Sequence, residues 1–233
     1  MVSLIRIQRR INFFLKIVKW PVALLMLLVV PATFQTVRHY YAIRYQLNRL
    51  PLFYFAVGAV FFVAIRIFVL LRKGKAETLE HEMTHTLFAM AMFHPVQRID
   101  LNETGGGSMS FKGEGNWLIA IAPYFFPLSA FTMMFFAIAI RQAIGYSPDW
   151  IYIGLGITVC YNLFSFAEQT HPQQTDFKVA GYLFTICLLP GANCLSFGTL
   201  FAYTERGLDG ILFFYRLLEY YARHNFYALM NLL

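Results

Sequence analysis

Long stretches without charged residues are the feature that most limits what this chain can fold into. Five ranges of 18 residues or more carry no charge or a single one, which is Arg66. They are 20–37, 51–71, 115–140, 150–167 and 179–204. About 20 apolar residues in a helix are enough to cross the hydrocarbon core of a bilayer. Each range is therefore predicted to be a transmembrane helix.

The rest of the chain completes one membrane-embedded domain, which we predict to cover residues 1–233. A sixth candidate span, 77–94, is polar in its first half and apolar in its second. Residues 1–19 are basic and amphipathic, so we expect a surface arm rather than a cleaved signal. Residues 207–233 are predicted to form an amphipathic C-terminal helix. The expected fold is all-α, with about six transmembrane helices and a short β-like glycine-rich segment.

Composition excludes several other classes of protein. The chain is 58% hydrophobic and only 13% charged, about half the charge of an average soluble domain. Intrinsic disorder needs the opposite balance, and three cysteines are too few for a disulfide framework. The net charge of +7 does not indicate nucleic-acid binding, because most Lys and Arg residues flank the apolar ranges. Their distribution favours a multi-pass protein with a cytoplasmic N-terminus.

The polar half of the sixth candidate span contains His81-Glu82-Met83-Thr84-His85. On a helix, His81 and His85 lie on one face, one turn apart, where both imidazoles can bind one metal ion. Glu82 is placed to take a proton from the attacking water rather than to bind the metal. This is the H-E-x-x-H signature of zinc hydrolases, and it predicts a Zn²⁺ site with Glu82 as the catalytic base.

Two histidines leave the predicted zinc site short of a ligand. Asp176 is the favoured third ligand, because it lies in a polar patch that interrupts otherwise apolar sequence and that Pro172 breaks. Irregular backbone at membrane depth is tolerated inside protein or beside water, so this patch could fold inward. Asp209 and His171 are the alternatives. If Asp176 binds the metal, His171 is expected to support the site or to contact substrate.

A glycine-rich segment lies between the two halves of the predicted site. Gly106 and Gly107 belong to a run of three glycines, which allows another chain to approach the backbone closely. Residues 108–112 alternate between polar and apolar, as short strands do. An edge strand here could hold an extended peptide by main-chain hydrogen bonds. A plain glycine turn between two helices is the alternative.

These motifs resemble the site-2 protease family of intramembrane zinc metalloproteases, of which this chain looks like a divergent member. In that family one helix bears H-E-x-x-H, and a later segment carries an Asn, a Pro and a ligand Asp. Asn162, Pro172 and Asp176 resemble this second element loosely, because Phe177 replaces the usual Gly and the Asn–Pro spacing is longer. The resemblance covers about residues 77–189. It implies a small β element near the site, and it makes Asn162 a residue that could support the site or contact substrate.

The expected function is zinc-dependent cleavage of a membrane-embedded or membrane-adjacent peptide by a metal-activated water. Its expected partners are a membrane protein or peptide substrate and the lipid bilayer. Two alternatives use the same residues. One is a membrane-anchored metalloprotease whose site faces the cytoplasm, and the other is a non-catalytic metal-binding membrane protein. Glu82 distinguishes these functions, because both proteases need it as the base and a non-catalytic metal-binding protein does not.

Overall fold

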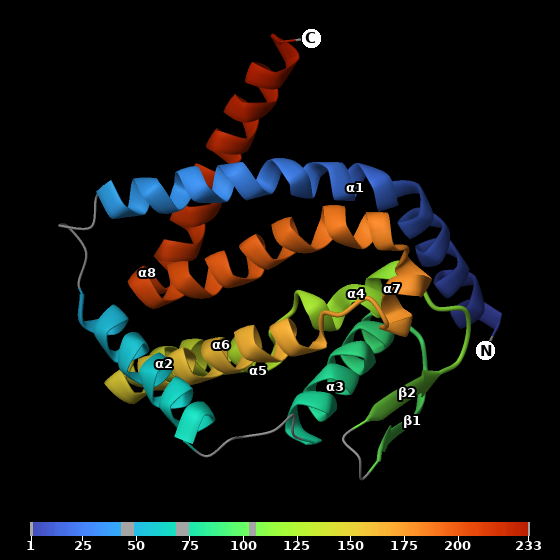
Figure 1. Cartoon of the computed structure of the whole chain (residues 1–233), viewed down its shortest axis with the longest axis horizontal. Coiled ribbons are helices and arrows are strands. Elements are labelled where there is room, and N and C mark those ends of the chain that lie inside the picture. Colours follow the sequence, from blue (N-terminus) through green and yellow to red (C-terminus); the bar gives the residue numbers. More distant parts are fainter. Residues whose placement is uncertain (1, 43–48, 69–74, 103–105, 233) are drawn as a thin grey trace.

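The structure is a computed structural model that describes residues 2–42, 49–68, 75–102 and 106–232. It is mostly helical, with a small two-stranded sheet. Parts of four expected features lie outside the described residues: Met1 of the basic arm, the end of the 51–71 span, the first glycine of the 105–107 run and Leu233 of the C-terminal tail. In Figure 1 the long helix α1 arches over α8, and α3 and the sheet lie at one end of the molecule.

Within the described ranges, four helices are long and apolar enough to cross a membrane. They lie in α1 (Val2–Ala42), α2 (Leu50–Phe68), α6 (Asp149–Gln169) and α8 (Tyr182–Met230). A bent pair adds a fifth if it counts as one span. The prediction of about six spans is therefore not confirmed. The membrane character itself is supported, because lipid demands helices whose backbone groups are all satisfied internally.

Two of the predicted spans take other forms. The 77–94 range holds α3 (Lys75–Ala91), which has 17 residues and is not among the membrane-length helices. The 115–140 range breaks into α4 (Trp117–Ile121), the short 3-10 helix η2 (Ala122–Tyr124) and α5 (Leu128–Ile144), with a bend of 78°. Pro127, which has no backbone N–H to donate, stands directly before α5.

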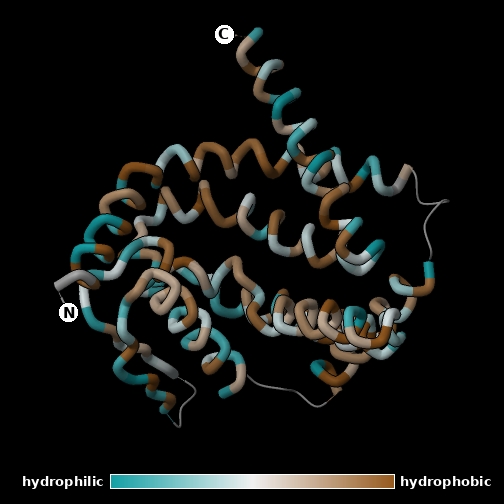
Figure 2. Tube along the Cα trace, turned by 180° about the vertical axis from the view of Figure 1, so that it is seen from behind, coloured by the Kyte–Doolittle hydropathy of each residue, from teal (hydrophilic) through white to brown (hydrophobic). Residues whose placement is uncertain are grey.

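The two predicted segments that flank a span are joined to it in different ways, one without a break and one across a kink. The basic arm and the 20–37 span form the single helix α1, which contains Pro21 and Pro31 without a break. Figure 2 shows hydrophobic residues along the middle of α1 and hydrophilic ones nearer its N-terminal end. The 179–204 span and the C-terminal tail both lie in α8, and Gly207, whose backbone is non-helical, separates them at a kink. The predicted boundary of the tail at residue 207 is therefore present as a kink, although no loop divides the two parts.

The N-terminal part of α1 is anchored to the end of the molecule that carries the sheet. Asn12 donates a hydrogen bond to the carbonyl of Glu114, and Asn116 donates one to Asn12. The indole N–H of Trp117 donates to the carbonyl of Leu15 at 2.8 Å. Asn116 also caps α4, accepting hydrogen bonds from the backbone N–H groups of Leu118 and Ile119. One face of the predicted arm is thus engaged with protein.

The sheet is an antiparallel hairpin of β1 (Val96–Leu101) and β2 (Gly107–Phe111). It follows α3 through a tight reversal at Phe93, a non-glycine residue with a positive φ of 62°. The glycine-rich segment therefore forms a strand, as its alternation predicts, and β2 contacts α3. Within the described residues β1 is the one strand that pairs with β2.

Candidate metal centre

The two histidines of the H-E-x-x-H motif lie on one face of α3, as their spacing predicts. The Nε2 atoms of His81 and His85 are 3.1 Å apart. His85 is buried, and its Nδ1 lies 2.8 Å from the carbonyl oxygen of Ile119. Because a carbonyl only accepts hydrogen bonds, Nδ1 of His85 carries the proton and its Nε2 keeps a free lone pair.

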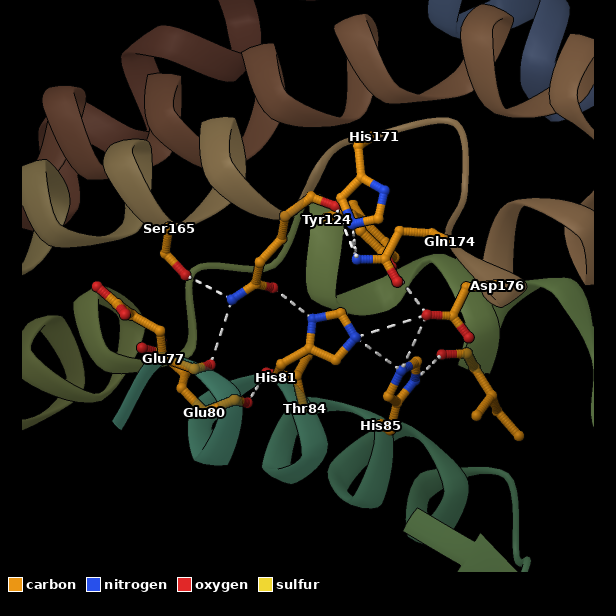
Figure 3. A network of polar contacts seen from close by, with 12 residues as sticks. Glu77, Glu80, His81, Thr84, His85, Tyr124, Ser165, His171, Gln174 and Asp176 are labelled. Carbon is orange, nitrogen blue, oxygen red and sulfur yellow. Dashed lines mark hydrogen bonds and ion pairs between the residues drawn. The ribbon is translucent and has the colours of Figure 1, made fainter. Parts of the chain in front are cut away.

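Asp176 completes the cluster from a distant part of the chain. After α6 the chain turns at Pro172 and enters the short helix α7 (Thr175–Ala180), whose first turn carries Asp176. Its Oδ2 lies 3.5 Å from Nε2 of His81 and 3.5 Å from Nε2 of His85. Figure 3 shows the three side chains converging on one point. The polar patch therefore folds inward at the Pro172 turn.

The three converging atoms fit a metal ion. His81, His85 and Asp176 are the one such group of His, Cys, Asp or Glu found among the described residues. Two imidazole nitrogens and one carboxylate oxygen lie within 3.1–3.5 Å of one another. In a tetrahedral site with metal–ligand distances of about 2.0–2.1 Å, neighbouring ligand atoms are about 3.3 Å apart. Lone pairs and a negative charge this close also favour a positive charge between them, which a metal ion would supply.

Hydrogen bonds and burial set the charge of the acidic groups. Burial alone would raise the pKa of Asp176, but the adjacent imidazoles of His81 and His85 outweigh it and hold this pKa well below its usual range. The Tyr124 hydroxyl also donates to Oδ2 of Asp176, at 2.8 Å. Burial raises the pKa of Glu82, partly offset by the two histidines. Asp176 is thus held as an anion, and Glu82 takes up a proton more readily than an exposed glutamate.

Glu82 lies between α3 and the strand β2. A Cβ added to Gly107 would come within 2.9 Å of Cγ of Glu82 and 2.6 Å of Cγ2 of Thr78. Only glycine allows this approach, because every other residue would bring the β-carbon into these side chains. The backbone of β2 therefore runs directly beside the Glu82 side chain.

A cavity of about 310 Å³ opens at this point. His81, Glu82, His85 and Asp176 line it together with residues of β2, among them Ser108, Met109 and Phe111. A second cavity of about 260 Å³ adjoins it and shares His81, Glu82 and Gly107. The lining thus combines the metal-binding side chains, the predicted base and one strand.

The other predicted site residues lie at different distances from the cluster. His171 and Gly106 line the second cavity, and His171 contacts the side-chain amide of Gln174 at 3.0 Å. Asn162 lies on α6, where it donates to the Ser129 hydroxyl at 2.6 Å and to the carbonyl of Thr158 rather than to either histidine. Asp209 is exposed on α8. Of the three candidate third ligands, the structure brings only Asp176 to the histidine pair.

Two residues of the site were missed from the sequence. Tyr124 follows an apolar run and gives no local signal, yet its hydroxyl contacts the ligand Asp176. Gln169 contacts Nδ1 of His81 through its side-chain oxygen. A signal for Gln169 was present, since Asn162, Ser165 and Gln169 repeat at helical spacing in an otherwise apolar helix.

Glu80 and Glu77 fix α3 on its other faces. Glu80 accepts a hydrogen bond from the backbone N–H of Ser129 at 2.7 Å, in the first turn of α5. Glu77 pairs with Arg66 of α2 at 2.7 Å, and Arg66 also pairs with Glu168. α3 is thereby linked to α2, α5 and α6 through charged side chains.

Comparison with models of known protein families, with curated proteins and with solved structures found no match.

Proposed function

We propose that the chain is an intramembrane zinc endopeptidase that cleaves a membrane-embedded or membrane-adjacent peptide. The observation that carries the proposal is the placement of Glu82 beside the His81–His85–Asp176 cluster, in a cavity that β2 lines. Two imidazoles and a carboxylate are a ligand set that zinc takes in catalytic sites, where it leaves one position open. When bound, zinc supplies polarisation of the scissile carbonyl and a lowered pKa for water.

In this proposal the other groups of the cavity act on the peptide and the proton. The Glu82 carboxylate takes a proton from the attacking water and passes one to the leaving amine nitrogen. β2 binds the substrate as an added strand, because its backbone borders the cavity and a helical substrate must unwind before its carbonyls are accessible. The side chains of Met109 and Phe111 contribute apolar surface to the cavity. We place the N-terminus on the cytoplasmic side, following the distribution of Lys and Arg.

The test combines metal analysis with a cleavage assay on the purified full chain in detergent. The probe is a mixture of transmembrane peptides whose products are identified by mass spectrometry. We expect one zinc per wild-type chain and cleavage of at least one peptide. Glu82→Gln should keep the zinc and lose cleavage, because the amide cannot take up the proton. Asp176→Ala should lose both.

Asp209→Ala is the matched control, because it removes another aspartate that is exposed on α8. It should keep the zinc and the activity of the wild type. Full cleavage by Glu82→Gln would contradict the role of Glu82 as the base. Zinc binding without cleavage of any peptide by the wild type would favour a metal-binding protein without catalysis. Full zinc content in Asp176→Ala would show that Asp176 is not the third ligand.

A further inference from the structure

The two histidines of the metal centre are held differently at the ring nitrogen that points away from it. Nδ1 of His85 faces a backbone carbonyl, which no substitution of a side chain removes. Nδ1 of His81 instead faces the side-chain oxygen of Gln169, which is 4% exposed. An amide side chain has an accepting end and a donating end. Its orientation therefore decides where the proton of His81 lies.

Two acceptors fix the orientation of the Gln169 amide. Its Nε2 lies 2.9 Å from the hydroxyl oxygen of Ser165 and 3.3 Å from the backbone carbonyl oxygen of Glu77. The carbonyl can only accept, so the NH₂ group must point toward it and Oε1 toward His81. Figure 3 shows Ser165 and Glu77 on the side of His81 that faces away from His85 and Asp176. The amide thus links Ser165 of α6 to His81 of the metal centre.

The opposite orientation would block the centre. An NH₂ group facing His81 would require Nδ1 to accept, and the ring proton would then lie on Nε2. That proton would point at Nε2 of His85, which is 3.1 Å away, and would occupy the position that a metal needs. The ring contacts of His81 with His85 and Tyr124 place the ring but do not select its tautomer.

We propose that Gln169, held by Ser165 and Glu77, is the positioning residue that fixes His81 as the Nδ1–H tautomer and keeps Nε2 free for the metal. The inference rests on the metal centre of the proposed function, but it requires neither zinc in particular nor peptide cleavage. Gln169 is the last residue of α6, and its carbonyl accepts a hydrogen bond from the Gln174 side chain at 3.0 Å. The C-terminal end of α6 therefore orients the ligand His81 and begins the turn that places the ligand Asp176.

The experiment measures the tautomer directly, in metal-free full-length chain labelled with ¹⁵N-histidine. The His81 signals are assigned by their absence in His81→Asn. We expect a protonated Nδ1 and an unprotonated Nε2 for His81 in the wild type. Gln169→Leu should populate the Nε2–H form and weaken Zn²⁺ binding by about 10–100-fold, measured by competition with a chelating dye. Gln169→Glu should keep the wild-type tautomer, because a carboxylate only accepts.

Gln8→Leu is the matched control, because Gln8 is a buried glutamine that donates to the carbonyl of Phe93, away from the cluster. It should leave the tautomer and the zinc affinity unchanged. An Nε2–H form of His81 in the wild type would overturn the proposal, and this measurement needs no variant to fold. An unchanged tautomer and affinity in Gln169→Leu would also overturn it. Absence of cleavage in a chain with the expected tautomer would instead contradict the protease alone.

Discussion

One buried face of α6 carries apolar side chains in its first half and polar side chains in its second half. The two halves stabilise the protein in different ways. The first half presents Ile151, Leu155 and Val159, all buried. The second half presents Asn162, Ser165 and Gln169, which are 1%, 5% and 4% exposed. The spacing of three to four residues continues unchanged between them. The same helix face thus packs against neighbours at one end and orients polar groups at the other.

The first half of α6 packs against α2 by contact between backbones. A Cβ on Gly156 would lie 2.0 Å from the carbonyl oxygen of Phe55, and one on Gly58 of α2 would lie 2.0 Å from that of Ile153. Between membrane helices, where lipid is as apolar as the side chains, small residues permit the close packing that drives association. Stability in this half of α6 therefore depends on the small volume of the residues where it meets α2.

The second half of α6 depends on pairing of donors and acceptors. Asn162 donates to the Ser129 hydroxyl, and the N–H of Ser129 donates to Glu80 on α3. A buried polar group left without a partner costs about 1–3 kcal/mol. Loss of one side chain here therefore affects its partner as well as itself.

The largest effect on stability is expected from Gly156→Ala. The new methyl group would force α2 and α6 apart, and overpacking of this kind costs about 3 kcal/mol at its upper end. The measurement is the free energy of unfolding in mixed detergent micelles. Gly154→Ala is the matched control on the same helix, since its Cβ would meet only the flexible end of Met133. Destabilisation of both variants to the same extent would contradict the backbone contact.

Metal binding at the polar end of α6 should stabilise the folded protein by nearly as much as Gly156→Ala destabilises it. A ligand present at 100 times its Kd stabilises the folded state by about 2.7 kcal/mol. We expect Zn²⁺ at that concentration to raise the Tm of the wild type and of Gly156→Ala by similar amounts, and a chelator to reverse both shifts. Asp176→Ala should show no shift. A comparable shift in Asp176→Ala would indicate that the metal binds elsewhere.

Asn162→Leu is expected to cost about 1–2 kcal/mol, because it removes the donor to Ser129 while keeping similar volume. Its zinc affinity should stay within about twofold of the wild type, since Asn162 donates to Ser129 and Thr158 and to neither histidine. Chemical unfolding and zinc titration measure the two quantities on the same sample. A tenfold loss of zinc affinity would place Asn162 in direct support of the centre, as its resemblance to the family motif implies.

The two halves of α6 also differ in what the sequence could predict. Its apolar first half lies in an uncharged range, and the lack of charge is enough to predict a helix. The same signal could not distinguish one straight span from the bent α4–α5 pair, because the length and composition of the two are alike. Pro127 stands at the bend, directly before α5. Among the described residues the number of membrane-length helices is therefore four, or five if the bent pair is one span.

In the candidate site, local patterns were predictable and distant contacts were not. His81 and His85 are one turn apart on a single helix, so the motif predicts their proximity. The proximity of Asp176 depends on the turn at Pro172, for which the polar patch was an indirect sign. The contacts of Tyr124 and Gln169 with the ligands come from tertiary packing. The polar spacing on α6 could have singled out Gln169 but not its partner, and Tyr124 carries no pattern of its own.

The smallest effect is expected from Ser165→Ala, which tests whether the polar half acts as a connected unit. The variant removes one of the two acceptors of the Gln169 amide, while the Glu77 carbonyl still holds the other N–H. Zinc affinity should therefore fall by only about two- to fivefold, equivalent to roughly 0.5–1 kcal/mol. In a Gln169→Leu background the same substitution should change zinc affinity no further, because the amide that Ser165 orients is gone. Additive losses in the double variant would mean that Ser165 supports the centre by a route that does not pass through Gln169.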